Sequence, residues 1–108
     1  MGFGRWYPLV EAAAHAPVGP GVYQVRLAQG LVAYPTGRSA MIHYAAAADL
    51  RRAVAELARI HAGRAWLCRF AEPAPAAARD STTAADVMLS ELLTAFRRRF
   101  GAPPGFPE

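Results

Sequence analysis

Two stretches separated by a turn-rich segment constrain the fold of this chain most. Residues 22–27 alternate in polarity, so Tyr23 and Val25 lie on one face and Gln24 on the other, which is typical of a half-buried strand. Residues 41–54 begin as a short apolar strand and pass almost at once into a helical pattern. We therefore expect two paired strands that present Tyr23 and a histidine, followed by an arginine-bearing helix.

The helix after the second strand has recognisable start and end signals. Asp49 is expected to cap its first turn, because a carboxylate accepts hydrogen bonds from the free backbone N–H groups there. Gly63 is expected to end it. The inner stripe of this helix consists of Leu50, Val54, Leu57 and His61, the last as a packed core histidine.

The segment between the two strands predicts a hairpin extension. Gln29 and Gly30 form a plausible turn into a further strand over residues 31–34. Residues 35–39 then break the pattern, which predicts an exposed loop that carries Arg38 close to the strand of His43.

The second half of the chain predicts one more strand and one more helix. Trp66–Phe70 alternates as a third strand, and the Pro/Ala-rich residues 72–79 predict a loop. Thr83 and Asp86 have the spacing of a capping box for the last helix, which ends in the triplet Arg97–Arg99 before a glycine. The apolar face of that helix consists of Leu89, Leu92, Leu93, Phe96 and Phe100, and Phe106 beyond it is expected to pack back on the body.

The N-terminal segment, residues 1–16, predicts an element that caps one end of the core. Pro8 suits the first turn of a short helix that runs to His15. His15 has no partner at metal-ligand spacing, which favours a surface role. The apolar cluster of this segment consists of Trp6, Tyr7, Leu9 and Val10.

Composition limits the chain to one small domain and leaves its partner open. The net charge is +4 over 108 residues, and all twelve basic residues are arginine. This charge is compatible with a polyanionic partner and equally with a solvated basic surface. The lone Cys68 excludes an intrachain disulfide, and its apolar neighbours favour a buried position. No apolar segment reaches membrane-span length and no secretory signal is recognised, so we expect a cytoplasmic protein without membrane contact.

Three features together resemble the GIY-YIG nuclease superfamily over roughly residues 17 to 106. Gly21-Val22-Tyr23 matches the first motif, whereas His43-Tyr44-Ala45 stands where the second motif has Tyr-(Ile/Val)-Gly. The last helix, with Glu91, is similar to the C-terminal helix of that family. The resemblance implies an α+β fold, with a small, mainly antiparallel sheet of three or more strands flanked by helices.

The resemblance also implies a catalytic arrangement that this chain has only in part. In the family the motif tyrosine, here Tyr23, lies near the attacking water, and a glutamate, here Glu91, holds one divalent metal ion, Mg²⁺ or Mn²⁺. The arginine expected on the first helix falls at Ala53, which cannot neutralise phosphate charge, and the adjacent Arg52 points about 100° away. His43 either replaces the missing tyrosine as a general base or marks decay of the site. We expect Tyr23 and Glu91 to share one shallow basin.

These features favour a catalytically impaired domain that acts as a nucleic-acid-binding or assembly module, with DNA ahead of RNA as partner. One alternative is an active metal-dependent endonuclease in which His43 and Arg52 have taken over the lost roles. A third is a protein-interaction or oligomerisation domain. The predicted nucleic-acid-binding residues are Arg38, Arg51, Arg52, Arg97, Arg98 and Arg99.

Overall fold

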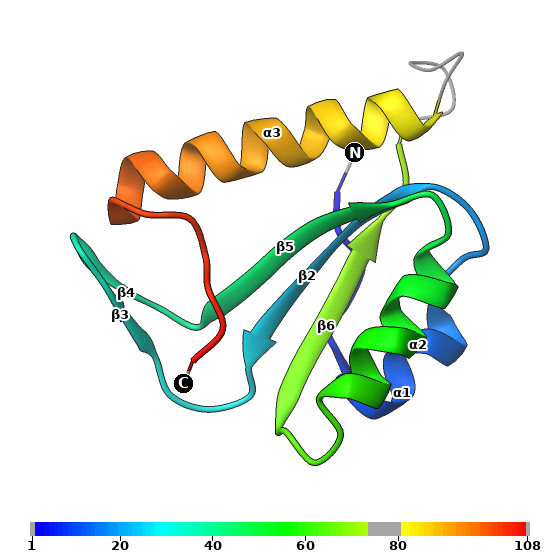
Figure 1. Cartoon of the computed structure of the whole chain (residues 1–108), viewed down its shortest axis with the longest axis horizontal. Coiled ribbons are helices and arrows are strands. Elements are labelled where there is room, and N and C mark those ends of the chain that lie inside the picture. The colour runs from blue at the N-terminus through cyan, green and yellow to red at the C-terminus, as the bar shows by residue number, and fades with distance from the viewer. Residues whose placement is uncertain (1, 74–80, 108) are drawn as a thin grey trace.

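A computed structural model describes residues 2–73 and 81–107 of the chain. Within these ranges an antiparallel sheet carries α1 and α2 on one face and α3 along the other (Figure 1). The elements follow in the order β1 (Tyr7–Pro8), α1 (Leu9–His15), β2 (Gly21–Leu27), β3 (Val32–Tyr34), β4 (Gly37–Ser39), β5 (Met41–Ala47), α2 (Leu50–Ile60), β6 (Trp66–Ala71) and α3 (Ser81–Phe100).

The main sheet has the strand order β1-β6-β2-β5, and every neighbouring pair is antiparallel. This confirms the predicted α+β class and its mainly antiparallel sheet. β2 and β6 occupy the centre, whereas β1 and β5 form the two edges. No helix in the described part of the chain is long and apolar enough to cross a membrane.

The predicted hairpin between residues 22–27 and 31–34 is wrong. β2 pairs with β5 and β6, whereas β3 pairs with β4 in a separate two-stranded sheet. Arg38 therefore lies on strand β4 and not on a loop. The physical reason is that β2 has both of its edges filled by longer strands, which leaves no edge for β3.

β2 is buried on both faces, and the expectation of a half-buried strand is therefore also wrong. Val22 and Val25 are fully buried although their side chains point to opposite faces, and Gln24 is only 3% exposed. α3 covers the face that was expected to meet water. The alternating pattern predicts the strand correctly, but it does not indicate whether one or both faces of the strand are covered by helices.

Helix α2 starts where it was predicted, but it ends at Ile60, so His61 is its C-cap residue and Gly63 lies beyond it in a turn. The Asp49 carboxylate accepts a hydrogen bond from the Arg52 backbone N–H at 3.2 Å, so the predicted cap is confirmed. The stripe residues Leu50, Val54 and Leu57 are buried against the sheet together with Cys68. Burial raises the pKa of the Cys68 thiol to about 12, which keeps it in its neutral form.

The N-terminal segment belongs to the core. β1 extends the sheet by pairing with β6, and α1 packs against α2. Leu9 is 2% exposed and Ala12 is fully buried. Val10, predicted to join the apolar cluster, is 70% exposed because it lies on the outer side of α1.

Helix α3 begins at Ser81, before the predicted capping box. Thr83 and Asp86 therefore lie inside the helix and do not form its end. Most of the predicted loop at residues 72–79 falls outside the described residues. On the inner side of α3, Ala85 and Phe96 are buried against the sheet. Phe96 packs edge-on against Tyr44 of β5, with ring centroids 5.5 Å apart.

Candidate functional site

Tyr23 and His43 lie close together on one face of the sheet. Their strands pair so that Tyr23 faces Ala45 and Val25 faces His43, which places the two rings diagonally across the β2–β5 ladder. The ring centroids are 5.7 Å apart. Tyr23 is 8% exposed within the core formed with α1 and α2, and this burial raises the pKa of its hydroxyl.

The C-terminal tail covers His43, an arrangement that sequence reasoning expected only in general terms. Phe106 stacks on His43 at 4.7 Å between centroids and lies 4.9 Å from His61 and 5.4 Å from Trp66. Burial and the neighbouring His61 lower the pKa of His43. A neutral imidazole beneath an aromatic ring is therefore its state at neutral pH.

The position expected to carry the family arginine lines a small hollow at the junction of β5 and α2. Ala53 contributes only an uncharged methyl group there. The exposed Arg52 shares this hollow with Glu56. The residues around it are Ala47, Ala48, Asp49, Arg52, Ala53 and Glu56.

Arg51 has a structural role that the sequence did not indicate. Its Nε donates a hydrogen bond to the carbonyl oxygen of Ala16 at 2.9 Å, and its backbone N–H donates to the carbonyl oxygen of Pro17 at 3.2 Å. These bonds tie the start of α2 to the chain that leaves α1. Arg51 is therefore partly committed to holding the two helices together.

The structure does not bring Tyr23 and Glu91 together. Tyr23 points to the face covered by α1 and α2, whereas α3, which carries the exposed Glu91, packs on the face of Gln24 and Tyr44. The expected shared basin is absent because neighbouring residues of a strand point to opposite faces and α3 crosses the other one.

The residues expected to hold a divalent metal ion do not fit that task. Glu91 is an exposed carboxylate on the far side of the sheet from Tyr23 and His43. Among residues 2–73 and 81–107 no three histidine, cysteine, aspartate or glutamate side chains are grouped closely enough to share a metal ion.

The predicted basic residues fall into two groups at opposite ends of β5. Arg38 precedes β5 on strand β4, whereas Arg51 and Arg52 follow it at the start of α2. The β3–β4 ribbon is fastened to the end of α3, since Thr36 donates its backbone N–H to the Phe100 carbonyl oxygen at 3.0 Å and its hydroxyl to that of Arg99 at 2.8 Å. The strand that carries Arg38 thus lies beside the helix end that carries Arg97–Arg99, and we call these four residues the basic end.

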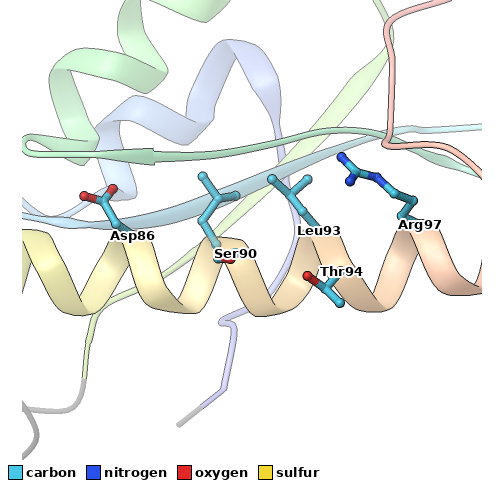
Figure 2. Close-up of a pocket in the computed structure, with 6 residues that line it drawn as sticks. Asp86, Ser90, Leu93, Thr94 and Arg97 are labelled. Atoms are coloured by element: carbon cyan, nitrogen blue, oxygen red, sulfur yellow. The ribbon is translucent and has the colours of Figure 1, made fainter.

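A groove runs along α3 and leads towards the basic end. Asp86, Leu93 and Arg97 project from one side of the helix in Figure 2, because residues seven and four apart share a helix face. The groove is lined by Asp86, Leu89, Ser90, Leu93, Thr94 and Arg97. The residues that line it are mixed in polarity, with the acidic Asp86 at one end and the basic Arg97 at the other.

Sequence reasoning missed a cluster of guanidinium and aromatic groups on the α3 face of the sheet. Arg26 and Arg69 lie with their Cζ atoms 4.8 and 4.5 Å from the ring centroid of Trp6. Arg69 also lies 4.8 Å from the Phe3 centroid, and its Nε donates to Gln24 Oε1 at 2.7 Å. The alternating pattern put Gln24 and Arg26 on one face. It predicted neither their register with β6 nor the position of residues 3–6 beside them.

Comparison with protein-family models, with curated proteins and with solved structures finds no match to this chain.

Proposed function

We propose that this domain binds nucleic acid through the basic end and does not hydrolyse it. The observation that carries the proposal is that hydrogen bonds from Thr36 hold the β3–β4 ribbon, which carries Arg38, against the end of α3 that carries Arg97–Arg99. None of the four forms an ion pair with a described residue. The ion pair seen among the described residues joins Arg59 to Glu56 on α2. Unpaired guanidinium groups supply the phosphate contacts that dominate nucleic-acid affinity.

The triplet also has a local stabilising effect that does not exclude this role. Cations in the last turn of a helix interact favourably with its negative end, and Arg97–Arg99 occupy that turn of α3. This interaction alone would not require Arg38 nearby. The ribbon that holds the strand of Arg38 beside this helix end supports a binding surface in addition to helix stabilisation.

The absence of cleavage in this proposal rests on the separation of the candidate catalytic groups. Phosphodiester hydrolysis needs a water activator, a metal ligand and a cation on the same phosphate. Tyr23 and Glu91 lie on opposite sides of the sheet, and Ala53 stands where a cation is needed. Phe106 further covers His43, the alternative base.

Fluorescence anisotropy with a labelled DNA duplex tests the binding part. We expect affinity to fall steeply between roughly 50 and 200 mM salt. Replacing Arg97, Arg98 and Arg99 with Gln should weaken binding and reduce the salt slope by roughly three, about one for each arginine–phosphate interaction removed. The matched control replaces the exposed Arg5, Arg59 and Arg64 with Gln, which removes the same charge away from the basic end. Equal reductions of affinity in both triple variants, or affinity that does not change with salt, would contradict the proposal.

Incubation of plasmid DNA with the protein and Mg²⁺ or Mn²⁺ tests the second part. We expect the supercoiled form to persist with the wild type and with Glu91→Ala alike. Nicking by the wild type that is absent in Glu91→Ala would favour the endonuclease alternative. A parallel binding measurement with single-stranded RNA tests the preference for DNA.

A further inference from the structure

The cluster formed by Trp6, Arg26 and Arg69 contains two cations without a counter-ion. Arg26 faces Leu67 and Arg69 faces Gln24 across the β2–β6 ladder, so the two arginines are diagonal neighbours on one face of the sheet. No carboxylate among the described residues pairs with either of them. Burial, and Coulomb repulsion from Arg26, lower the pKa of Arg69, opposed by Tyr44. The fold therefore bears a like-charge pair that its described side chains do not neutralise.

The aromatic rings leave the Nη donors of these arginines available. Trp6 contacts both guanidinium groups, and Phe3 contacts Arg69, at distances of a cation–π interaction. Such stacking occupies the flat faces of a guanidinium, whereas its N–H donors point outwards in the plane. Gln24, itself buried, fixes Arg69 through Nε and leaves both Nη groups of Arg69 without an acceptor among the described residues.

One donor of the cluster is both buried and unsatisfied. Nε of Arg26 is enclosed and has no hydrogen-bond partner within residues 2–73 and 81–107. Buried polar groups are nearly always paired, and leaving a charged one unpaired is unfavourable. Trp6, Arg26 and Arg69 are all half-buried, so each keeps part of its surface open to solvent.

We propose that Trp6, Arg26 and Arg69 form an oxyanion site that takes a phosphate group. Two neighbouring guanidinium groups match a phosphate, which carries up to two negative charges and several acceptor oxygens. The phosphate comes from a nucleic-acid backbone or from free phosphate. For the backbone the inference rests on the proposed function; for free phosphate it is independent of it.

An NMR titration with inorganic phosphate at constant ionic strength tests the site. We expect saturable shifts of the Nε–Hε signals of Arg26 and Arg69 and of the Trp6 indole N–H. The indole N–H of Trp66, buried in the core on the other face, should not move. Shifts that grow linearly and equal those caused by chloride would overturn the inference. Saturation by acetate at the same concentration as phosphate would overturn the assignment to phosphate in favour of a carboxylate.

Substitutions give a second, independent readout. Arg26→Gln should weaken phosphate binding about tenfold, the usual effect of removing one charge-assisted hydrogen bond. Arg64→Gln is the matched control, because Arg64 also lies over an indole, 5.7 Å from the Trp66 centroid, but outside the site. If Arg26→Gln does not fold, Arg26→Lys keeps the charge without the planar fork and should still weaken binding. Equal affinity in wild type and in the folded Arg26 variant would overturn the inference.

A short oligothymidylate separates the two sources of phosphate. Shifts of the same three signals by the oligonucleotide support a backbone phosphate, whereas shifts by inorganic phosphate alone support a free one. The Gln variants of Arg97–Arg99 distinguish this inference from the proposed function. If those variants lose duplex binding but keep the phosphate shifts, the oxyanion site is supported separately from the basic end. If they keep duplex binding but lose the phosphate shifts, the phosphate does not bind at Trp6, Arg26 and Arg69, and the inference is overturned.

Discussion

Packing leaves no room for a side chain at position 21, where Gly21 also belongs to the first motif. A Cβ atom at this position would lie 2.5 Å from the carbonyl oxygen of Ala71 and would overlap Cδ1 of Leu50. β2 therefore passes too close to β6 and α2 for any side chain. The same glycine that carries the resemblance to GIY-YIG domains is thus explained by the local structure without reference to catalysis.

Gly21→Ala should lower the free energy of unfolding by about 1–3 kcal/mol, because the added methyl group forces β6 or Leu50 to move. Urea denaturation monitored by circular dichroism measures the change. Gly105→Ala is the control, since nothing lies within 4 Å of its added Cβ and its backbone φ is not in the left-handed region. Similar stability of the two variants would contradict the packing explanation.

At the scale of single residues, the sequence identified most of the core but not the joint geometry of the site. Leu50, Val54 and Cys68 are buried as expected, because helix and strand periodicity fixes which face each occupies. The relation between Tyr23 and Glu91 depends instead on which face of the sheet α3 covers. That choice is made by tertiary packing and leaves no local signal in the sequence.

At the scale of elements, local signals succeeded and the expected pairing of the strands of Tyr23 and His43 is confirmed, whereas the predicted hairpin is wrong. The cap at Asp49 predicted the start of α2, because capping depends on neighbouring residues alone. β1 is two residues long and carries no readable pattern. The turn at Gln29 and Gly30 predicted a hairpin, but β2 pairs along its whole length with β5 and β6 instead.

The packing of the C-terminal tail on the sheet has a pH dependence that follows from His43. The pKa of His43 is lowered from its ordinary value of 6.5 by burial and by His61, so the unfolded chain binds a proton more readily than the folded one. The stability associated with neutral His43 is fully present above pH 6.5 and is lost as the pH falls through that value towards the lower folded pKa. Protonation also places a charge beneath Phe106.

The melting temperature should therefore fall as the pH drops below about 6.5, and His43→Phe should reduce this fall, because phenylalanine keeps the stacking on Phe106 without titrating. Differential scanning calorimetry across the pH range measures both. His15→Phe is the control, since His15 stacks on Tyr7 and lies outside the cluster around Phe106. An unchanged pH dependence in His43→Phe would show that other groups dominate.

At the scale of the whole molecule, the two faces of the sheet divide the chain into a closed side and a more open side. Tyr23, His43 and the core lie beneath α1, α2 and the tail. The other face carries Arg26 and Arg69 and is crossed by α3, which ends at the basic end. Both proposed contacts with phosphate thus lie on the α3 side of the sheet, away from the site implied by the sequence motifs.

The closed side depends on the N-terminal segment, which composition and pattern separated from the rest of the domain. Leu9 is 2% exposed and joins the same core as Val25 and Leu50, so its truncation leaves a cavity between α1 and the sheet. Leu9→Ala should lower the free energy of unfolding by about 2–5 kcal/mol. Val10→Ala, next to it but 70% exposed, should change it by less than about 0.5 kcal/mol. Chemical denaturation of both variants compares their stability directly. A single transition that shifts for Leu9→Ala alone means that residues 1–16 unfold together with the sheet. A transition that does not shift in Leu9→Ala would mean that residues 1–16 form a separate appendage.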